Sequence, residues 1–189
     1  MHSIAKFNEH KTKFFLYYLY GIYTHLSENK KLNNYRVLVL MGSKNDSAIL
    51  EAALPYYDYF GIAAEFVVSS AHRDPARTVE YASSARAKGF SAIVCGAGMA
   101  AHLAGVCAAN SDLPVIGVPL AGGISDGLDA LLSTVQMPGG VPVATFAVGK
   151  AGAINAAVFI ARLLSLSDET LINKLDSFRA HGCKLPISV

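Results

Sequence analysis

Cysteine is scarce in this chain: the 189 residues include three, Cys95, Cys107 and Cys183. An odd number of cysteines without a CxxC spacing is not the pattern of a disulfide-stabilised secreted fold. It indicates neither a zinc site nor a thiol nucleophile, and it suits reduced thiols in a cytoplasmic protein. We interpret Cys95 and Cys107 as small buried apolar residues.

Charge is also sparse, since 16% of the residues are charged and the net charge is +2. The region beyond the N-terminal segment has no basic stripe interleaved with aromatic residues, which argues against a nucleic-acid partner. The hydrophobic share of 52% argues against disorder and is enough for one globular domain with a sizeable core. We therefore expect a small-molecule ligand.

Long hydrophobic runs are absent: none approaches the roughly 20 apolar residues of a transmembrane helix. We expect no membrane partner. The mean hydropathy of +0.36 is nevertheless high. Buried parallel strands and apolar subunit interfaces would account for it.

Residues 1–34 differ from the rest of the chain. Their apolar run is tyrosine-rich, is broken by Gly21 and lacks an Ala-x-Ala cleavage pattern, so it is a poor signal peptide. We interpret the segment as an N-terminal extension, disordered or the product of a misassigned start, that carries no chemistry.

From Arg36 onward, short β-branched runs alternate with helical stretches, which is typical of βαβ units and a parallel sheet. The fold class predicted is α/β, a three-layer α/β/α sandwich of flavodoxin-like type in a single domain, 35–166. The predicted strands are 36–40, 64–68, 92–95, 114–118 and 143–148.

Helix signals follow each strand. Asp46 or Ser47 could cap a helix running to about residue 60, and Asp74 with Pro75 reads as an N-cap followed by proline at the first helical position. The other predicted helices are 77–88, 102–109, 128–135, 153–164 and 168–181.

The loop Ser69-Ser70-Ala71-His72-Arg73-Asp74-Pro75 is the most informative segment. A histidine, with a reference pKa of about 6.5, can both accept and donate a proton near neutral pH. The Arg73 guanidinium can bind phosphate or carboxylate oxygens in bidentate fashion, and Ser70 adds a hydroxyl donor. A lone His-Arg pair would more often be an ordinary surface loop.

Two further loops follow predicted strands. Gly42-Ser43-Lys44-Asn45-Asp46 opens a helix, where backbone amides could face an anion, although Asp46 could equally be a plain helix cap. Gly96-Ala97-Gly98 permits close backbone approach to a ligand, and His102 follows it. By pattern alone, this third loop could be ordinary strand–helix packing.

Together, Gly42–Asp46, Ser69–Pro75 and the segment 127–140, which contains Val-Gln-Met-Pro-Gly-Gly, resemble the class I N5-carboxyaminoimidazole ribonucleotide mutases of purine biosynthesis, the PurE family. The resemblance runs from about residue 36 to about residue 164. Asn45, Ser47, Asp74 and Ala104 depart from the residues usual in the family.

The resemblance implies a role for each loop. His72 is the general acid and base and His102 a supporting catalytic residue, while Ser43, Asp46, Ser70 and Arg73 bind the substrate. The remaining pocket loop residues are Gly42, Ala71, Gly96, Ala97 and Gly98. We expect no cofactor and no metal.

The implied reaction converts N5-carboxyaminoimidazole ribonucleotide to 4-carboxy-5-aminoimidazole ribonucleotide, in the cytoplasm. The family also implies a homo-octamer with shared active sites, in which the C-terminal helix of segment 167–189 packs on a neighbouring subunit. The alternatives are carboxylation of aminoimidazole ribonucleotide with free carbon dioxide, a related carboxylase acting on a pyridine nucleotide, and a non-catalytic nucleotide-binding module.

Overall fold

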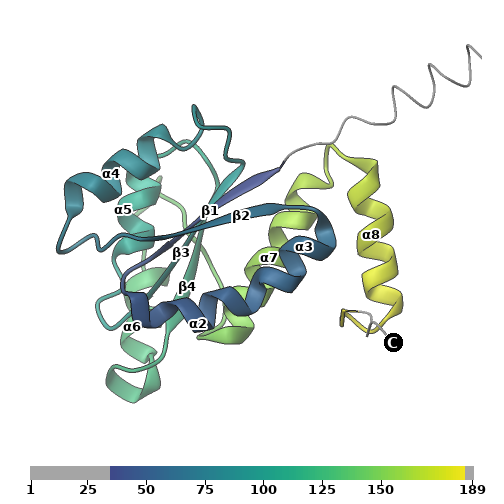
Figure 1. Ribbon diagram of the computed structural model, residues 1–189. Helices are drawn as coiled ribbons and strands as arrows, with labels where there is room; N and C mark the ends of the chain where they lie inside the picture. The colour runs from purple at the N-terminus through teal and green to yellow at the C-terminus, as the bar shows by residue number, and fades with distance from the viewer. Residues whose placement is uncertain (1–34, 186–189) are drawn as a thin grey trace, which may run out of the picture. The chain divides into compact units, whose positions relative to one another are not determined.

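A computed structural model describes residues 35–185, which lie within one compact unit; the predicted N-terminal extension 1–34 lies outside the described residues. Five parallel strands form one sheet in the order β2-β1-β3-β4-β5 (Figure 1). The strands are β1 (Arg36–Met41), β2 (Ala63–Val68), β3 (Ala92–Gly98), β4 (Val115–Leu120) and β5 (Ala144–Thr145). The predicted flavodoxin-like α/β sandwich is confirmed.

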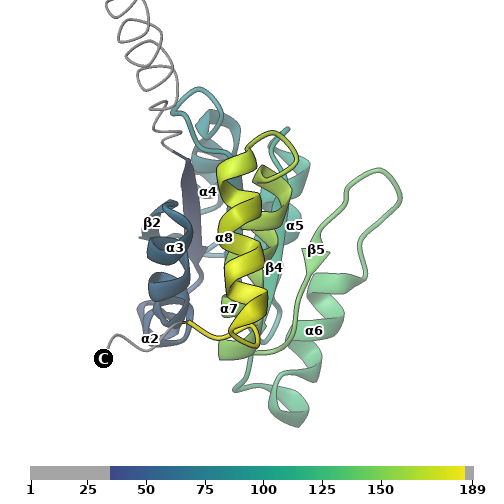
Figure 2. The same ribbon diagram turned by 90° about the vertical axis from the view of Figure 1, so that its right-hand side faces the viewer.

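Helices cover both faces of the sheet (Figures 1 and 2). One face carries α2 (Ser47–Leu50), α3 (Leu54–Phe60) and α7 (Lys150–Leu164), and the other carries α4 (Pro75–Ser84), α5 (Leu103–Ala109) and α6 (Leu128–Val135). Short 3-10 turns occupy Lys44–Asp46, Glu51–Ala53 and Ile124–Asp126. No described helix is long and apolar enough to span a bilayer.

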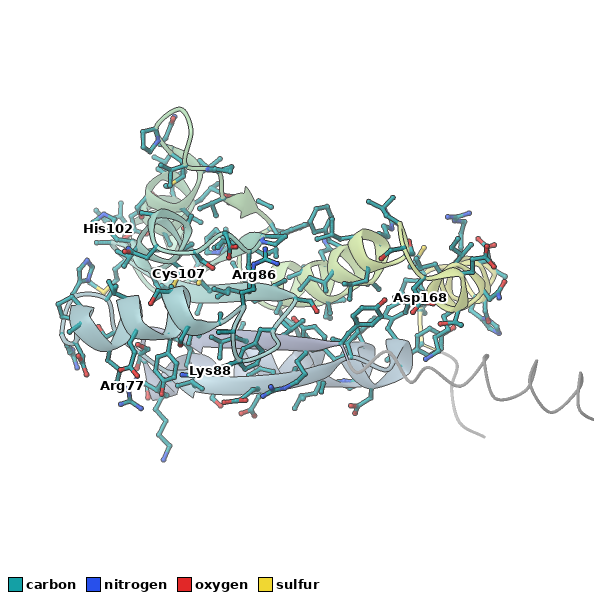
Figure 3. All side chains as sticks on the ribbon, turned by 90° about the horizontal axis from the view of Figure 1, so that it is seen from above. Arg77, Arg86, Lys88, His102, Cys107 and Asp168 are labelled. Atoms are coloured by element: carbon teal, nitrogen blue, oxygen red, sulfur yellow. The ribbon has the colours of Figure 1, made fainter. Side chains whose placement is uncertain are left out.

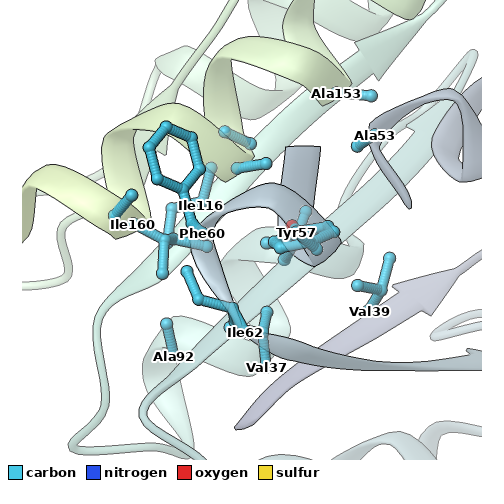
Figure 4. Close-up of a cluster of buried hydrophobic side chains, with 14 of the residues drawn as sticks. Val37, Val39, Ala53, Tyr57, Phe60, Ile62, Ala92, Ile116, Ala153 and Ile160 are labelled. Atoms are coloured by element: carbon cyan, nitrogen blue, oxygen red, sulfur yellow. The ribbon is translucent and has the colours of Figure 1, made fainter. Parts of the chain in front are cut away.

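The alternation of side chains along β1 builds two cores. Val37 and Val39 face α3 and α7, whereas Leu38 and Leu40 face α4 and α5. Figure 4 shows Tyr57 of α3 among the first set. Because both faces are buried, each central strand is a nearly continuous apolar run, which is the pattern that predicts a parallel sheet.

The last helix, α8 (Glu169–Ala180), packs outside α7 and α3 (Figure 2). Phe178 is buried there, with its ring centroid 5.6 Å from that of Phe60 and 6.1 Å from that of Tyr56. Leu171 and Leu175 join the same core. The expectation that α8 also contacts a neighbouring subunit stays a prediction.

β5 is shorter than predicted. Only Ala144–Thr145 pairs with β4, instead of residues 143–148. Pro119 of β4 lacks the backbone N–H that the ladder would need beyond this point, so regular pairing stops. Single hydrogen bonds still join Phe146 N to Gly117 O and Gly149 N to Pro119 O.

The helix after β1 also differs from the prediction. Asp46 occupies the N-cap position of α2, but its side chain makes no capping hydrogen bond there. The Ser43 hydroxyl accepts from Asn45 N in the preceding 3-10 turn, and the 3-10 turn Glu51–Ala53 separates α2 from α3. The predicted start of α4 is confirmed, because the Asp74 carboxylate accepts from Arg77 N and Pro75 is the first helical residue, but the helix ends at Ser84 and not at Lys88.

Cys95 and Cys107 are buried against each other between β3 and α5, as the sequence predicted, whereas Cys183 is exposed. Burial, reinforced by the contact with Cys107, raises the pKa of the Cys95 thiol. Cys95 therefore stays a protonated thiol that packs in the core, and Cys107 packs against it.

Candidate active site

A pocket with a volume of about 500 Å³ lies at the carboxyl ends of the strands. Four loops line it, those after β1, β2, β3 and β4. β1 and β3 are adjacent, and the chain winds in opposite directions from them, so the pocket sits at the topological switch point where parallel α/β sheets bind ligands.

Ten of the eleven residues predicted for the site line this one pocket. They are Gly42, Ser43, Asp46, Ser70, Ala71, His72, Arg73, Ala97, Gly98 and His102.

Gly96 is the exception. It is buried beneath the pocket, and a Cβ at this position would lie 2.6 Å from Leu50 Cδ1. Its carbonyl accepts a hydrogen bond from Gly42 N at 3.0 Å, which ties β3 to the first loop. The glycine is required for close packing of α2 on the sheet. Gly96 therefore lies one layer below the residues that line the pocket.

The first loop is closed by a reciprocal pair of hydrogen bonds. Asn45 N donates to Ser43 Oγ at 3.2 Å, and Ser43 N donates to Asp46 Oδ2 at 2.8 Å. Partial burial raises the pKa of the Asp46 carboxyl, and the hydrogen bond from Ser43 offsets part of that rise. The loop thus presents one hydroxyl and one carboxyl group to the pocket.

The second loop precedes α4 and is anchored from below. The buried hydroxyls of Ser69 and Thr78 lie 2.8 Å apart, and Ser70 Oγ accepts from Arg73 N at 3.4 Å. The Arg73 side chain is exposed and forms no ion pair with any residue between 35 and 185. Its guanidinium is consequently available to an anion bound in the pocket.

His72 and His102 come together across the pocket. His72 Nε2 lies 2.9 Å from His102 Nδ1, and the two rings are nearly perpendicular, at 88°. Both side chains are exposed, and His102 lies at one edge of the molecule, just before α5 (Figure 3). The pair can hold a proton and present it to a bound ligand.

The pocket wall also includes residues beyond those eleven. Met99, Ala100 and Leu103 line it from the third loop, and Ala121 and Gly122 from the fourth. Ala121 and Gly122 directly follow β4, the position from which loops of a parallel α/β sheet contact a ligand.

The residues that depart from the resemblance have local roles. Asn45 lines the pocket, and the Ser47 hydroxyl hydrogen-bonds to the Glu51 carboxylate. Asp74 caps α4, and Ala104 is buried between α5 and the sheet. Of the four, only Asn45 reaches the pocket surface.

Within residues 35–185, no three His, Cys, Asp or Glu side chains gather as ligands of a metal ion would. The polar side chains of the pocket are two imidazoles, a guanidinium, a carboxyl, the Asn45 carboxamide and serine hydroxyls. Such a set can bind a phosphorylated, hydroxylated ligand and transfer a proton to it.

Comparison with known proteins agrees with this geometry. Residues 36–184 match the family model described as AIR carboxylase. The N5-carboxyaminoimidazole ribonucleotide mutase of Bacillus subtilis is 50% identical over 141 residues, which cover 75% of this chain and 87% of that protein. The mutases of Vibrio parahaemolyticus (46%, 76% of this chain, 89% of that protein) and Escherichia coli K12 (43%, 78% and 87%) are also similar.

Among solved structures, the crystal structure of Treponema denticola PurE superposes with a TM-score of 0.72. The match covers 79% of this chain and 92% of that chain, at 24% identity. At this identity the likeness establishes the fold.

Proposed function

The chain belongs to the AIR carboxylase family, and we infer from this membership that it converts N5-carboxyaminoimidazole ribonucleotide to 4-carboxy-5-aminoimidazole ribonucleotide in purine biosynthesis. The three relatives described above, at 43–50% identity, are named mutases, which favours an isomerase over a carboxylase that uses free carbon dioxide.

The observation that carries this proposal is the hydrogen-bonded pair His72–His102 inside a pocket that also holds Arg73. An N-to-C carboxylate transfer needs one proton to be supplied and one to be removed within a single turnover. A histidine that gives up a proton in the first step and accepts one in the second meets both needs.

In the first step, protonated His72 donates a proton to the exocyclic nitrogen as the nitrogen–carboxylate bond breaks. The products are aminoimidazole ribonucleotide, carbon dioxide and neutral His72. In the second step, the ring carbon attacks carbon dioxide, and His72 removes the proton from that carbon, which restores the aromatic ring. His72 gives one proton to the exocyclic nitrogen in the first step and gains another from the ring carbon in the second, so the reaction is a balanced isomerisation.

Confinement supplies much of the rate advantage. A carbon dioxide molecule held beside its acceptor makes the second step effectively unimolecular, a gain that reaches about 7–11 kcal/mol in well-oriented reactions. The pocket volume of about 500 Å³ suits a mononucleotide-sized ligand. Its small residues, such as Ala97 and Gly98, allow the ring to approach the backbone closely.

The other polar residues bind the ribose phosphate. We assign the phosphate to the Arg73 guanidinium and the Ser70 hydroxyl, and the ribose hydroxyls to Asp46 with Ser43. The exposure of Arg73 and its lack of an ion pair among the described residues support the first assignment. The closed Ser43–Asp46 loop, with its carboxyl at the pocket, supports the second.

We also propose that the protein is a cytoplasmic homo-octamer in which neighbouring subunits complete each site. Several large apolar side chains are exposed: Met99, which lines the pocket, and Ile124 are 64% and 73% exposed, and Leu128, Leu132 and Val135 on α6 are close to half exposed. A patch of this kind supports a subunit interface. Light scattering that gave a monomer would contradict the proposal.

Isotope transfer tests the reaction itself. We would supply N5-carboxyaminoimidazole ribonucleotide labelled with ¹³C in its carboxylate, in buffer with unlabelled bicarbonate, and follow the label by ¹³C NMR. A mutase moves the label to the ring-carbon carboxylate faster than the unassisted reaction. A carboxylase would incorporate unlabelled carbon, and a nucleotide-binding module would bind the ligand without enzyme-dependent conversion.

A further inference from the structure

Ser133 lies on α6 and reaches the loop that carries one of the two histidines. Ala101, the residue before His102, donates its backbone N–H to Ser133 Oγ at 3.0 Å. Ser133 Oγ also lies 3.2 Å from Met99 O. One side chain thus spans the turn that leads from β3 into α5.

The hydroxyl of Ser133 is itself held in place. It has one proton to donate, and its shortest acceptor contact is Asp129 O, one turn earlier on α6, at 2.6 Å. This contact fixes the orientation of the hydroxyl, so that a lone pair faces Ala101 N. A hydrogen-bonded chain then runs from Ala101 N–H through Ser133 to the backbone of α6.

The loop needs this support because its own backbone is strained. Met99 has φ = 55°, a left-handed conformation that non-glycine residues rarely adopt. Ala101 is buried, and its N–H otherwise meets only Met99 O, two residues back, at 2.9 Å. Without the Ser133 hydroxyl, a buried N–H would depend on that tight contact alone.

The position of Ala101 sets that of His102. His102 N donates to Ala100 O at 2.9 Å, and His102 O accepts from Val106 N at 3.0 Å, so its backbone is bound both to the loop and to the first turn of α5. Its imidazole Nδ1 then lies 2.9 Å from His72 Nε2. A loop displacement of about 1 Å would be enough to break a hydrogen bond of this length.

We propose that Ser133 is a positioning residue for the reaction: through Ala101 it holds His102 at hydrogen-bond distance from His72. This inference rests on the proposed function, in which that pair handles the proton. Ser133 touches no reacting atom in the scheme and acts through the loop.

The test compares three variants of the full-length protein. Ser133→Ala removes the hydroxyl, Ser133→Thr keeps it, and Ser83→Ala is the matched control, since Ser83 Oγ donates to Val79 O at 2.8 Å in the same i−4 manner on α4. We expect Ser133→Ala to lower kcat by about tenfold to a hundredfold, with most of the loss in kcat and little in KM. Ser133→Thr should recover most of the loss, and Ser83→Ala should keep the wild-type kcat.

The proposal would be overturned if Ser133→Ala had the same kcat as wild type. It would also be overturned if Ser133→Thr folded but did not recover the kcat that Ser133→Ala loses. A crystal structure of Ser133→Ala tests the positioning role independently of whether the protein is a mutase. We expect the His72–His102 nitrogen distance to exceed 3.5 Å there, whether or not the wild type proves to be a mutase; an unchanged distance would overturn the positioning role.

Discussion

His72 and His102 are thirty residues apart in the sequence, yet His72 Nε2 and His102 Nδ1 lie 2.9 Å apart at the pocket. Only one of the two facing nitrogens can carry a proton in this hydrogen bond. A second proton on the pair must therefore sit on an outer nitrogen, and the pair can exchange protons with a ligand without losing the contact.

The guanidinium of Arg73 is expected to bind the phosphate of the substrate. Arg73→Ala should raise KM by about tenfold to a hundredfold, because hydrogen bonds to a charged group are worth about 1.5–3 kcal/mol, and should change kcat less. Arg73→Lys should be intermediate, since it keeps the charge and loses the bidentate geometry. Steady-state kinetics measures both constants.

Arg77 provides the control for this prediction. It is the next cation along the chain, is exposed and hydrogen-bonds to Tyr81 at 3.0 Å, away from the pocket lining. Arg77→Ala should keep the wild-type KM. An equal rise in KM for both alanine variants would mean that only general positive charge matters.

The raised pKa of Asp46 predicts a pH dependence of stability. The folded protein holds the Asp46 proton more tightly than the unfolded chain does. The resulting contribution to the free energy of unfolding is therefore fully present below the ordinary pKa of an aspartate, and it is lost as the pH rises through the pKa of Asp46 in the folded protein. Relative to Asp46→Asn, wild type should gain unfolding free energy as the pH falls from 7 toward 4. Urea unfolding of both proteins across this range measures the difference, and a relative loss for wild type would contradict the prediction.

Gly96 should tolerate no side chain. Gly96→Ala should lower the free energy of unfolding by about 1–3 kcal/mol, because its Cβ would overlap Leu50. Gly139→Ala is the control, since a Cβ there meets nothing within 4 Å and its φ lies outside the left-handed range. Thermal or urea unfolding compares the two, and equal stabilities would refute the packing role of Gly96.

Phe178 should anchor α8 to its own chain. Phe178→Ala should cost about 3–5 kcal/mol of unfolding free energy, because the ring is buried among Tyr56, Tyr59 and Phe60. Leu166→Ala, at a side chain that is 84% exposed, should be nearly neutral. A similar loss of unfolding free energy in the two variants would show that α8 is held mainly by contacts outside its own chain.

Local signals in the sequence predicted most of the fold. The apolar run of β1, the Asp74–Pro75 start of α4 and the boundaries of α6 depend on neighbours in the chain, and they are confirmed. The length of β5 depends instead on Pro119 in the adjacent strand, a contact that the local pattern does not contain.

Most residues of the candidate site could also be predicted from the sequence. Residues that directly follow strands could be assigned to one edge of the sheet, and most of them line the pocket. The burial of Gly96 under Leu50 and the contact of Ser133 with Ala101 join residues that are distant in sequence, through side-chain packing. No local pattern specifies such contacts.

The most direct test of proton transfer by His72 is a proton NMR time course with freshly prepared N5-carboxyaminoimidazole ribonucleotide, comparing wild type, His72→Asn and His181→Asn. His181 lies at the end of α8, outside the pocket lining, and serves as the control. We expect enzyme-dependent formation of the ring-carboxylated product in wild type and His181→Asn, and a loss of about 10²–10⁴-fold in His72→Asn with ligand affinity largely retained. A folded His72→Asn variant that turns over at the wild-type rate would contradict the account.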